Sequence, residues 1–128
     1  QQILDKMHHM MEQAEKRIYL SASGARLSGM ESDIAALLQR RIKVVLLTDK
    51  VPEKLKGAVS YKTEGKEEQV RLISDSRYVL TGELTGSPRD ICLYSGQRVF
   101  VEALKEAMRN EIKLIELTGK KKKAKGEA

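Results

Sequence analysis

The chain has 128 residues, of which 41% are hydrophobic and 33% charged, a composition typical of one globular domain rather than of a disordered or fibrous protein. No apolar run approaches the roughly 20 residues that a bilayer span requires, and no signal peptide is recognisable, so we expect no membrane partner. The single cysteine, Cys92, allows no internal disulfide, which is typical of a reducing compartment and predicts a cytoplasmic protein. Because the chain begins with Gln1 rather than Met, we expect it to be part of a longer protein.

The net charge of +6 is concentrated at the C-terminus. Residues 119–128, GKKKKAKGEA, hold five lysines and one glutamate, a net +4, which leaves only +2 for the rest of the chain. Because acidic and basic residues nearly cancel in the rest of the chain, its charge indicates no dedicated nucleic-acid-binding face. We expect the tail to be disordered and solubilising, because a run of like charges repels itself. The alternative is a nonspecific, salt-sensitive attraction to DNA or RNA.

The first half of the chain predicts a helix followed by a strand–helix–strand unit. Residues 2–16 place Ile, Leu, Met and Ala at helical spacing on one face. Residues 17–22 predict a strand, 28–42 a second helix, and 43–49, KVVLLTD, a strand buried on both faces. Such a βαβ unit of about 30 residues implies a parallel strand pair with a right-handed crossover.

The second half predicts further strands and a closing helix. Residues 58–65 fit either a short strand or an exposed loop, whereas 69–86 predict a hairpin and 89–95 another strand. A helix begins near residue 97, and residues 111–117 either extend it or form a last strand; we expect the helix. The predicted fold class is α/β, a mixed sheet flanked by helices.

Two residue types that often carry chemistry give no site here. His8 and His9 are neighbours on a helix, so their side chains point about 100° apart, and no second cluster of ligands accompanies them. We therefore expect no metal and no other cofactor. Cys92 lies inside the apolar pattern ICLY without a histidine nearby, which favours a small core residue over a nucleophile.

The loop SASGARLSG, residues 21–29, follows the first strand. Its two glycines have the wrong spacing for a phosphate-binding loop. Ser21 and Ser23 nevertheless lie at the carboxyl end of that strand, where ligands bind in open α/β sheets. A polar connecting loop is an equally good interpretation.

The hairpin carries a family resemblance. KRIYLSAS, a helix and RIKVVLLTD resemble the opening of a phospholipase D-type half, and LISDSRYVLTGE matches the segment that follows the His-x-Lys motif of those enzymes. Asp75 falls on the turn aspartate of that segment and Gly82 on its glycine. In this register Glu68 stands at the histidine position and Val70 at the lysine position. A carboxylate there cannot form the phosphohistidine on which the superfamily depends, so we expect no enzyme.

A long helix, a degenerate phospholipase D-like body and the hairpin DSRYVLTGE resemble the C-terminal effector domains of TrmB-type transcriptional regulators, over residues 3–117. The resemblance implies a sensor of sugars or similar small metabolites, such as sugar phosphates, in a protein whose winged helix-turn-helix DNA-binding domain lies outside this chain. We accordingly predict a linker or dimerisation helix at 1–16, an effector-sensing α/β domain at 17–118 and the disordered tail at 119–128.

A polar concavity at the former catalytic groove is the predicted ligand site. Arg71 suits a phosphate or carboxylate, Glu83 suits sugar hydroxyls, and Tyr94 suits the face of a ring. The full set of predicted ligand-binding residues is Ser21, Ser23, Arg71, Glu83, Tyr94 and Ser95. In the plainer interpretation, Arg71 and Glu83 pair with each other, Tyr94 caps the core, and Asp75 is structural because aspartate is favoured in turns.

The first helix is the predicted dimerisation element. Its apolar residues include Ile3, Met7, Met10 and Met11, and pairing with a second copy would bury them. In the alternative interpretation, this stripe packs on its own sheet. Two other classes of function remain open, a phosphodiesterase that uses unusual residues and a nucleic-acid-binding module that depends on the lysine tail.

Overall fold

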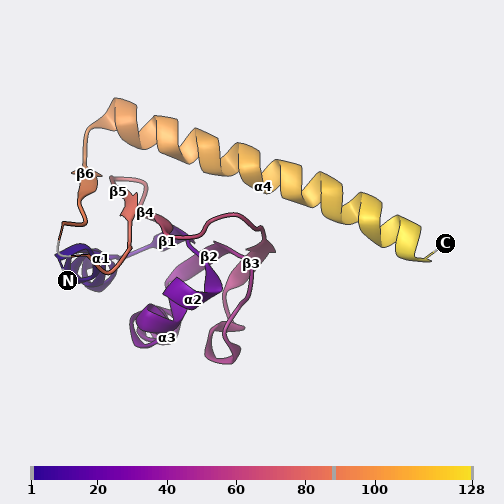
Figure 1. The fold of residues 1–128 in the computed structure, drawn as a ribbon, viewed down its shortest axis with the longest axis horizontal. Helices are drawn as coiled ribbons and strands as arrows, with labels where there is room; N and C mark the ends of the chain where they lie inside the picture. The colour runs from indigo at the N-terminus through magenta and orange to yellow at the C-terminus, as the bar shows by residue number, and fades with distance from the viewer. Residues whose placement is uncertain (1, 88, 128) are drawn as a thin grey trace.

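The computed structural model describes residues 2–87 and 89–127; for Gln2 and residues 119–127 it describes the backbone alone. The chain begins with α1 and a strand–helix–strand unit, continues into three antiparallel strands, and ends in a long helix (Figure 1). The helices are α1 (Gln2–Gln13), α2 (Gly24–Leu27), α3 (Glu31–Gln39) and α4 (Arg98–Glu127). The strands are β1 (Arg17–Ser21), β2 (Lys43–Thr48), β3 (Val59–Lys62), β4 (Gln69–Ser74), β5 (Tyr78–Glu83) and β6 (Cys92–Ser95).

The strands form one mixed sheet in the order β3-β2-β1-β4-β5-β6. β1 pairs in parallel with β2, and β2 with β3, whereas the three pairings from β1 to β6 by way of β4 and β5 are antiparallel. The crossover from β1 to β2 contains α2 and α3, as the predicted βαβ unit requires. The predicted α/β class with a mixed sheet is therefore confirmed, and residues 59–62 are a strand.

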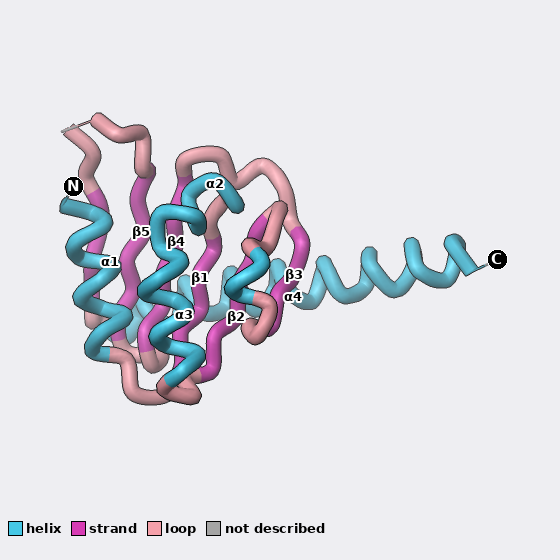
Figure 2. Tube along the Cα trace, turned by 90° about the horizontal axis from the view of Figure 1, so that it is seen from below, coloured by secondary structure: helices cyan, strands magenta, loops and turns pink. Residues whose placement is uncertain are grey.

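The helices cover the two faces of the sheet unequally. Figure 2 shows α1 and α3 side by side on one face, with α4 behind the strands and extending beyond β3. The central strands β1 and β2 are apolar toward both layers, because alternate side chains of a strand point to opposite faces. Ile18 and Leu20 lie in the core under α1 and α3, whereas Val45 and Leu47 lie in the core under α4.

The apolar face of α1 packs on its own sheet, which corrects the expectation of a dimerisation helix. Ile3, Met7, Met10 and Met11 are at most 4% exposed and belong to the core beneath α1 and α3. A side chain buried in this way has no surface to offer a second copy. The physical reason is that β4 and β5 reach beyond the span that α3 covers, and α1 shields that part of the sheet. The boundary predicted at residue 16 accordingly falls inside one packed unit.

The closing helix also differs from the prediction. Residues 111–117 extend it, as expected, but it then continues through the segment predicted to be a disordered tail and ends at Glu127. Lysine and alanine are good helix formers and no proline interrupts the run, so the stretch between Gly119 and Gly126 has a local propensity for helix. The side chains from residue 119 onward lie outside what the structure describes.

Candidate functional site

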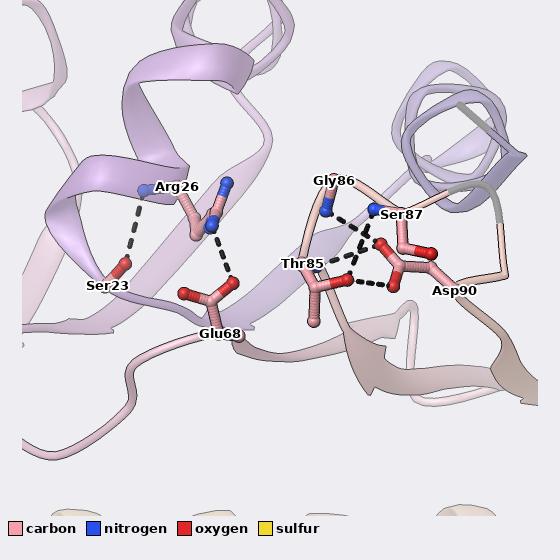
Figure 3. Close-up of polar contacts among 7 residues, drawn as sticks. All are labelled: Ser23, Arg26, Glu68, Thr85, Gly86, Ser87 and Asp90. Carbon is pink, nitrogen blue, oxygen red and sulfur yellow. Dashed lines mark hydrogen bonds and ion pairs between the residues drawn. The ribbon is translucent and has the colours of Figure 1, made fainter.

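Three segments meet at the edge of the sheet where β1 and β5 end and β4 begins. They are α2, the residues just before β4, and the loop between β5 and β6, residues 84–91. Arg26 of α2 and Glu68 before β4 join across this edge, with Arg26 Nη2 2.7 Å from Glu68 Oε2 (Figure 3). Both side chains are about one-third to two-fifths exposed, so a solute can reach them.

The N-terminus of α2 is positioned by short polar contacts. Ser23 Oγ accepts a hydrogen bond from the Arg26 backbone N–H at 3.3 Å, and the Gly24 N–H donates to Asp49 Oδ1 at 2.7 Å. A Cβ atom at Gly24 would lie only 2.8 Å from the Lys50 carbonyl oxygen. Glycine therefore allows α2 to lie against the end of β2, and this fixes the backbone from which Arg26 extends.

The loop after β5 is held by its own hydrogen bonds. The Asp90 carboxylate accepts from the backbone N–H groups of Thr85, at 2.9 Å, and Gly86, at 3.0 Å, and also from the Thr85 hydroxyl. The loop is joined to the residue just before β4 because the Leu84 N–H donates to the Glu68 carbonyl oxygen at 2.7 Å. Glu68 and the loop are thus hydrogen-bonded to each other and lie opposite α2 (Figure 3).

A cavity of about 510 Å³ lies between α2 and the loop after β5, and Glu68 adjoins it through Arg26 without lining it. Leucine side chains from α1 and from the end of β5 provide its apolar part, and Arg26 provides a charge beside small and hydroxyl residues. Its lining is Leu4, Ala25, Arg26, Ser28, Gly29, Leu84, Gly86 and Ser87. A volume of this size is within the range of sites for small metabolites. The combination of one guanidinium, serine hydroxyls and a leucine floor suits a polar ligand with an apolar face.

Glu68, which the sequence register places at the histidine position of phospholipase D enzymes, directs its carboxylate at Arg26. The lysine position, Val70, is fully buried in the core under α1 and α3 and cannot present a charge to a substrate. Within the described residues, the two histidines lie together on α1, and neither lines this cavity. Among the described residues, this edge therefore presents an ion-paired carboxylate and a buried valine at the two positions compared.

The structure brings only part of the predicted ligand site together. Ser23 lies at this edge and caps α2. Ser21 and Arg71 are direct cross-strand partners, but their strand positions place them with Tyr19 and Ile73 on the α4 face. Glu83 projects from the same face, opposite Gln69. Among the described residues no ion pair joins Arg71 to Glu83, so the predicted pairing is not found.

Tyr94 and Ser95 do not lie with the others, because β6 is antiparallel to β5. Ser95 pairs with Val79 and Tyr94 with Leu80, near the start of β5 rather than its end. Tyr94 stacks on Tyr78 with ring centroids 5.8 Å apart, and the Lys6 ammonium lies 3.9 Å from its ring centre. Ser95 Oγ accepts from the Gln97 N–H at 3.0 Å, just before α4 begins.

Arg26 and the pairing of Glu68 with it were missed by the sequence reasoning. Glu68 carried a signal, since it stands at the histidine position of the matched segment. Arg26 carried none, because it lies 42 residues away in the sequence and meets Glu68 only when β4 adds to β1.

Asp75 has a structural role at the opposite edge of the sheet. Its carboxylate accepts backbone N–H bonds from Glu15, Lys16 and Arg17 at 2.9, 2.8 and 3.0 Å, which fixes the passage from α1 into β1. Partial burial raises the pKa of this carboxyl, but the hydrogen bonds from Arg17, Glu15 and Lys16 together with the charge of Arg77 outweigh it, and the net pKa is lowered. The expectation that Asp75 is structural agrees with this placement.

Strand order, hairpin and groove define the class as a phospholipase D-type α/β half, and comparison with solved structures agrees. The chain is similar to NucT from Helicobacter pylori, with a TM-score of 0.66 and 11% identity over 89% of each chain. It is similar to Nuc from Salmonella typhimurium, a phospholipase D family member, with a TM-score of 0.63 and 11% identity over 84% of each chain. At these identities the likeness concerns the fold.

The family is shown by the sequence itself. Residues 1–100 match the family described as transcriptional regulator TrmB, EBD N-terminal subdomain, and the chain belongs to that family. It is also similar to TrmBL2, described as an archaeal chromatin protein with a novel mode of DNA binding, with a TM-score of 0.64 and 20% identity. That match covers 83% of this chain but 46% of the TrmBL2 chain, so these residues span about half of that protein. Comparison with curated protein sequences gave no match.

Two features are absent from the described part of the chain, a membrane-spanning helix and a cluster of metal ligands. No helix there has the length and apolar character needed to cross a bilayer. No group of three or more potential side-chain ligands gathers there to hold a metal ion.

Proposed function

We propose that the chain is the part of a TrmB-type transcriptional regulator that senses a small metabolite, a sugar or sugar phosphate, in the cavity beside Arg26 and Glu68. The observation that carries the proposal is a cavity of about 510 Å³ lined by Arg26, whose guanidinium is ion-paired to Glu68, the residue that the sequence register places at the phospholipase D histidine. The polar groups of this cavity suit binding.

The chemistry of the cavity favours a hydroxyl-rich ligand. Glu68 uses one carboxylate oxygen for Arg26, so the other is available to accept from sugar hydroxyls. Arg26 has further N–H donors, which can bind a hydroxyl or a phosphate oxygen. Leu4 and Leu84 suit the C–H face of a pyranose ring. Of the residues predicted from the sequence, Ser23 supports the site by capping α2, whereas Tyr94 is too far along β6 to stack on a ligand there.

The binding test uses isothermal titration of the protein with glucose, maltose, sucrose and glucose 6-phosphate. Glu68→Gln keeps the shape of the side chain but removes the charge that holds Arg26, so affinity should fall about tenfold or more, as expected for a charge-assisted hydrogen bond. Glu53→Gln, an exposed carboxylate on the segment after β2, is the matched control and should bind like the unaltered chain. Binding that Glu68→Gln and Glu53→Gln change equally would place the ligand elsewhere, and no binding by any of the four sugars would refute the proposed ligand class.

A phosphodiesterase is the second candidate, because NucT and Nuc share the fold. A glutamate cannot replace the histidine nucleophile in forming a phosphohistidine, which supports a role without catalysis. Purified protein is therefore expected not to hydrolyse bis(p-nitrophenyl) phosphate above the rate without protein. Turnover that is lost in Glu68→Gln would revive the enzyme.

The remaining parts of the proposal concern the whole regulator. DNA binding would belong to a domain outside these 128 residues, and a cytoplasmic location follows because a regulator acts where the chromosome is. If the full protein forms a homodimer, its contacts would use a surface other than the apolar face of α1, which this chain buries.

A further inference from the structure

The face of the sheet under α4 carries a second cavity, of about 400 Å³, lined by residues of α4 and of β1 to β4. Its floor is one cross-strand row. Ile73 is paired with Tyr19, Tyr19 with Val45, and Val45 with Val59, so four neighbouring strands contribute one residue each. Val59 remains 46% exposed, and the floor therefore stays open to solvent at the β3 edge.

Basic side chains border this floor from two sides. Arg17 and Lys43 are cross-strand partners one step before the floor row and point to the same face. Lys105, Arg109 and Lys113 follow at intervals of four residues along α4 and therefore lie on one stripe of the helix. All five line the cavity, together with one carboxylate, that of Glu116.

Most of this positive charge is not neutralised within the chain. Lys105 and Arg109 have glutamate partners one turn earlier on α4, at 3.8 and 3.1 Å. Within the described part of the chain, Arg17, Lys43 and Lys113 make no ion pair. The three cations without an ion pair repel one another around the apolar floor, and a bound anion would relieve that repulsion.

We propose that this groove binds a flat, multiply charged organic phosphate of the nucleotide class. The phosphates would lie between the Arg17–Lys43 pair and the basic stripe of α4, since guanidinium and ammonium groups from two elements can share their oxygens. The base would lie on the floor, where Tyr19 and Tyr61 supply aromatic surface. The volume of about 400 Å³ suits a mononucleotide rather than a macromolecule.

Such a ligand would also connect α4 to the sheet. α4 is otherwise held near this point by Lys66, whose ammonium lies 2.7 Å from Glu111 Oε2, and by packing of Met108 and Ile112. A phosphate between Lys43 and Lys113 would add a contact from the sheet to the next turn of the helix. The inference does not depend on the sugar proposal, because the two cavities share no lining residue.

The test is calorimetric titration of the whole chain with ADP, adenosine and inorganic phosphate, together with backbone NMR shifts. ADP should bind, with shifts gathered at 17–19, 43–45 and 105–113, and its affinity should fall as NaCl is raised. Adenosine and phosphate should each bind at least about tenfold more weakly, because each lacks one of the two contacts. Equal binding of phosphate alone would reduce the groove to a plain anion site and overturn the nucleotide assignment.

Charge reversal provides the matched comparison. Lys43→Glu should weaken ADP binding about tenfold or more, whereas Lys54→Glu makes the same change of net charge on an exposed side chain that lines neither cavity, and should leave it unchanged. Both lysines are exposed, so both variants should fold, which the thermal midpoint verifies. Equal loss in both variants would mean that only net charge matters. Tight binding of a ten-nucleotide DNA strand without any ADP binding would make the face a nucleic-acid interface instead, and either result refutes the proposal.

Discussion

Asp75 shows how one side chain can fix the entry into a sheet. It occupies the left-handed region, with φ of 54°, in the turn between β4 and β5, and its carboxylate receives three consecutive backbone N–H groups. Aspartate and asparagine tolerate this conformation better than other residues with a side chain. The turn residue thus satisfies donors that would otherwise be left unpaired between α1 and β1.

Asp75→Asn tests the carboxylate without changing the backbone preference. The amide can accept with one oxygen but must present its NH₂ group to another N–H, so we expect a loss of about 1–3 kcal/mol in the free energy of unfolding. Because the folded pKa of Asp75 is lowered, its contribution is present above the ordinary aspartate pKa and is lost as pH falls through the folded value. In urea unfolding between pH 2 and 7, the difference in free energy of unfolding between the two proteins should therefore become smaller as the pH falls. Glu64→Gln, an exposed carboxylate, should reproduce none of it.

His8 links α1 to α3 and should respond to pH in the opposite sense. Its Nδ1 lies 2.5 Å from Asp33 Oδ1, and this hydrogen bond and charge, with smaller effects from Glu12 and Asp5, raise the pKa of the imidazole despite slight desolvation. A raised folded pKa gives stability that is present below the unfolded value and is lost as pH rises through the folded one. Unfolding midpoints should fall from pH 6 to pH 8 more steeply in the unaltered chain than in His8→Gln. His9→Gln is the neighbouring control, and identical slopes in all three would contradict the assignment.

At the scale of elements, a polar contact at Glu111 attaches α4 to the connection between β3 and β4. Glu111 accepts from Lys66 at 2.7 Å and from the Thr63 hydroxyl at 3.4 Å, and these residues belong to the connection that follows β3. The Lys66 and Glu111 side chains are only 13% and 23% exposed, so they form a largely covered ion pair. The rest of the contact is apolar, with Val101 and Met108 buried against the strands.

Glu111→Ala should destabilise the chain by about 1–2 kcal/mol, because it leaves a mostly covered ammonium without its partner. This is between the effect of an exposed pair and that of a fully buried one. Glu106→Ala removes the exposed partner of Arg109 on the same helix and should cost less than about 0.5 kcal/mol. Thermal unfolding distinguishes the two, since 1 kcal/mol corresponds to about 4 °C for a domain of this size. Equal midpoints for both variants would mean that the Lys66 pair contributes nothing.

At the scale of the whole molecule, the sequence predicts the order of the elements along the chain and the fold class, but not where each strand lies in the sheet. The βαβ unit, the hairpin and the long last helix follow from periodicity and turn residues that act locally. The direction of β6 does not follow from local patterns, because strand order depends on contacts between distant segments. That direction is what separates Tyr94 from Glu83. The same holds for Arg26, which reaches Glu68 only through pairing of β1 with β4. Asp75 is different, because the preference of aspartate for turns is local and the structure places this residue in the turn between β4 and β5.

The packing of α1 on the sheet stabilises the entire fold. Ile3, Met7, Met10 and Met11 are buried, and each contributes about 1.5–3 kcal/mol by leaving water. Their sum is comparable with the 5–15 kcal/mol by which a whole domain is stable. A chain that begins at residue 14 should therefore lose cooperative unfolding and bind a hydrophobic dye. Met7→Ala, a smaller change in the same core, should cost about 2–5 kcal/mol, whereas Gln13→Ala on the exposed side should cost little. If the shortened chain unfolds at an unchanged midpoint, α1 is a separable linker and the sheet is stable without it.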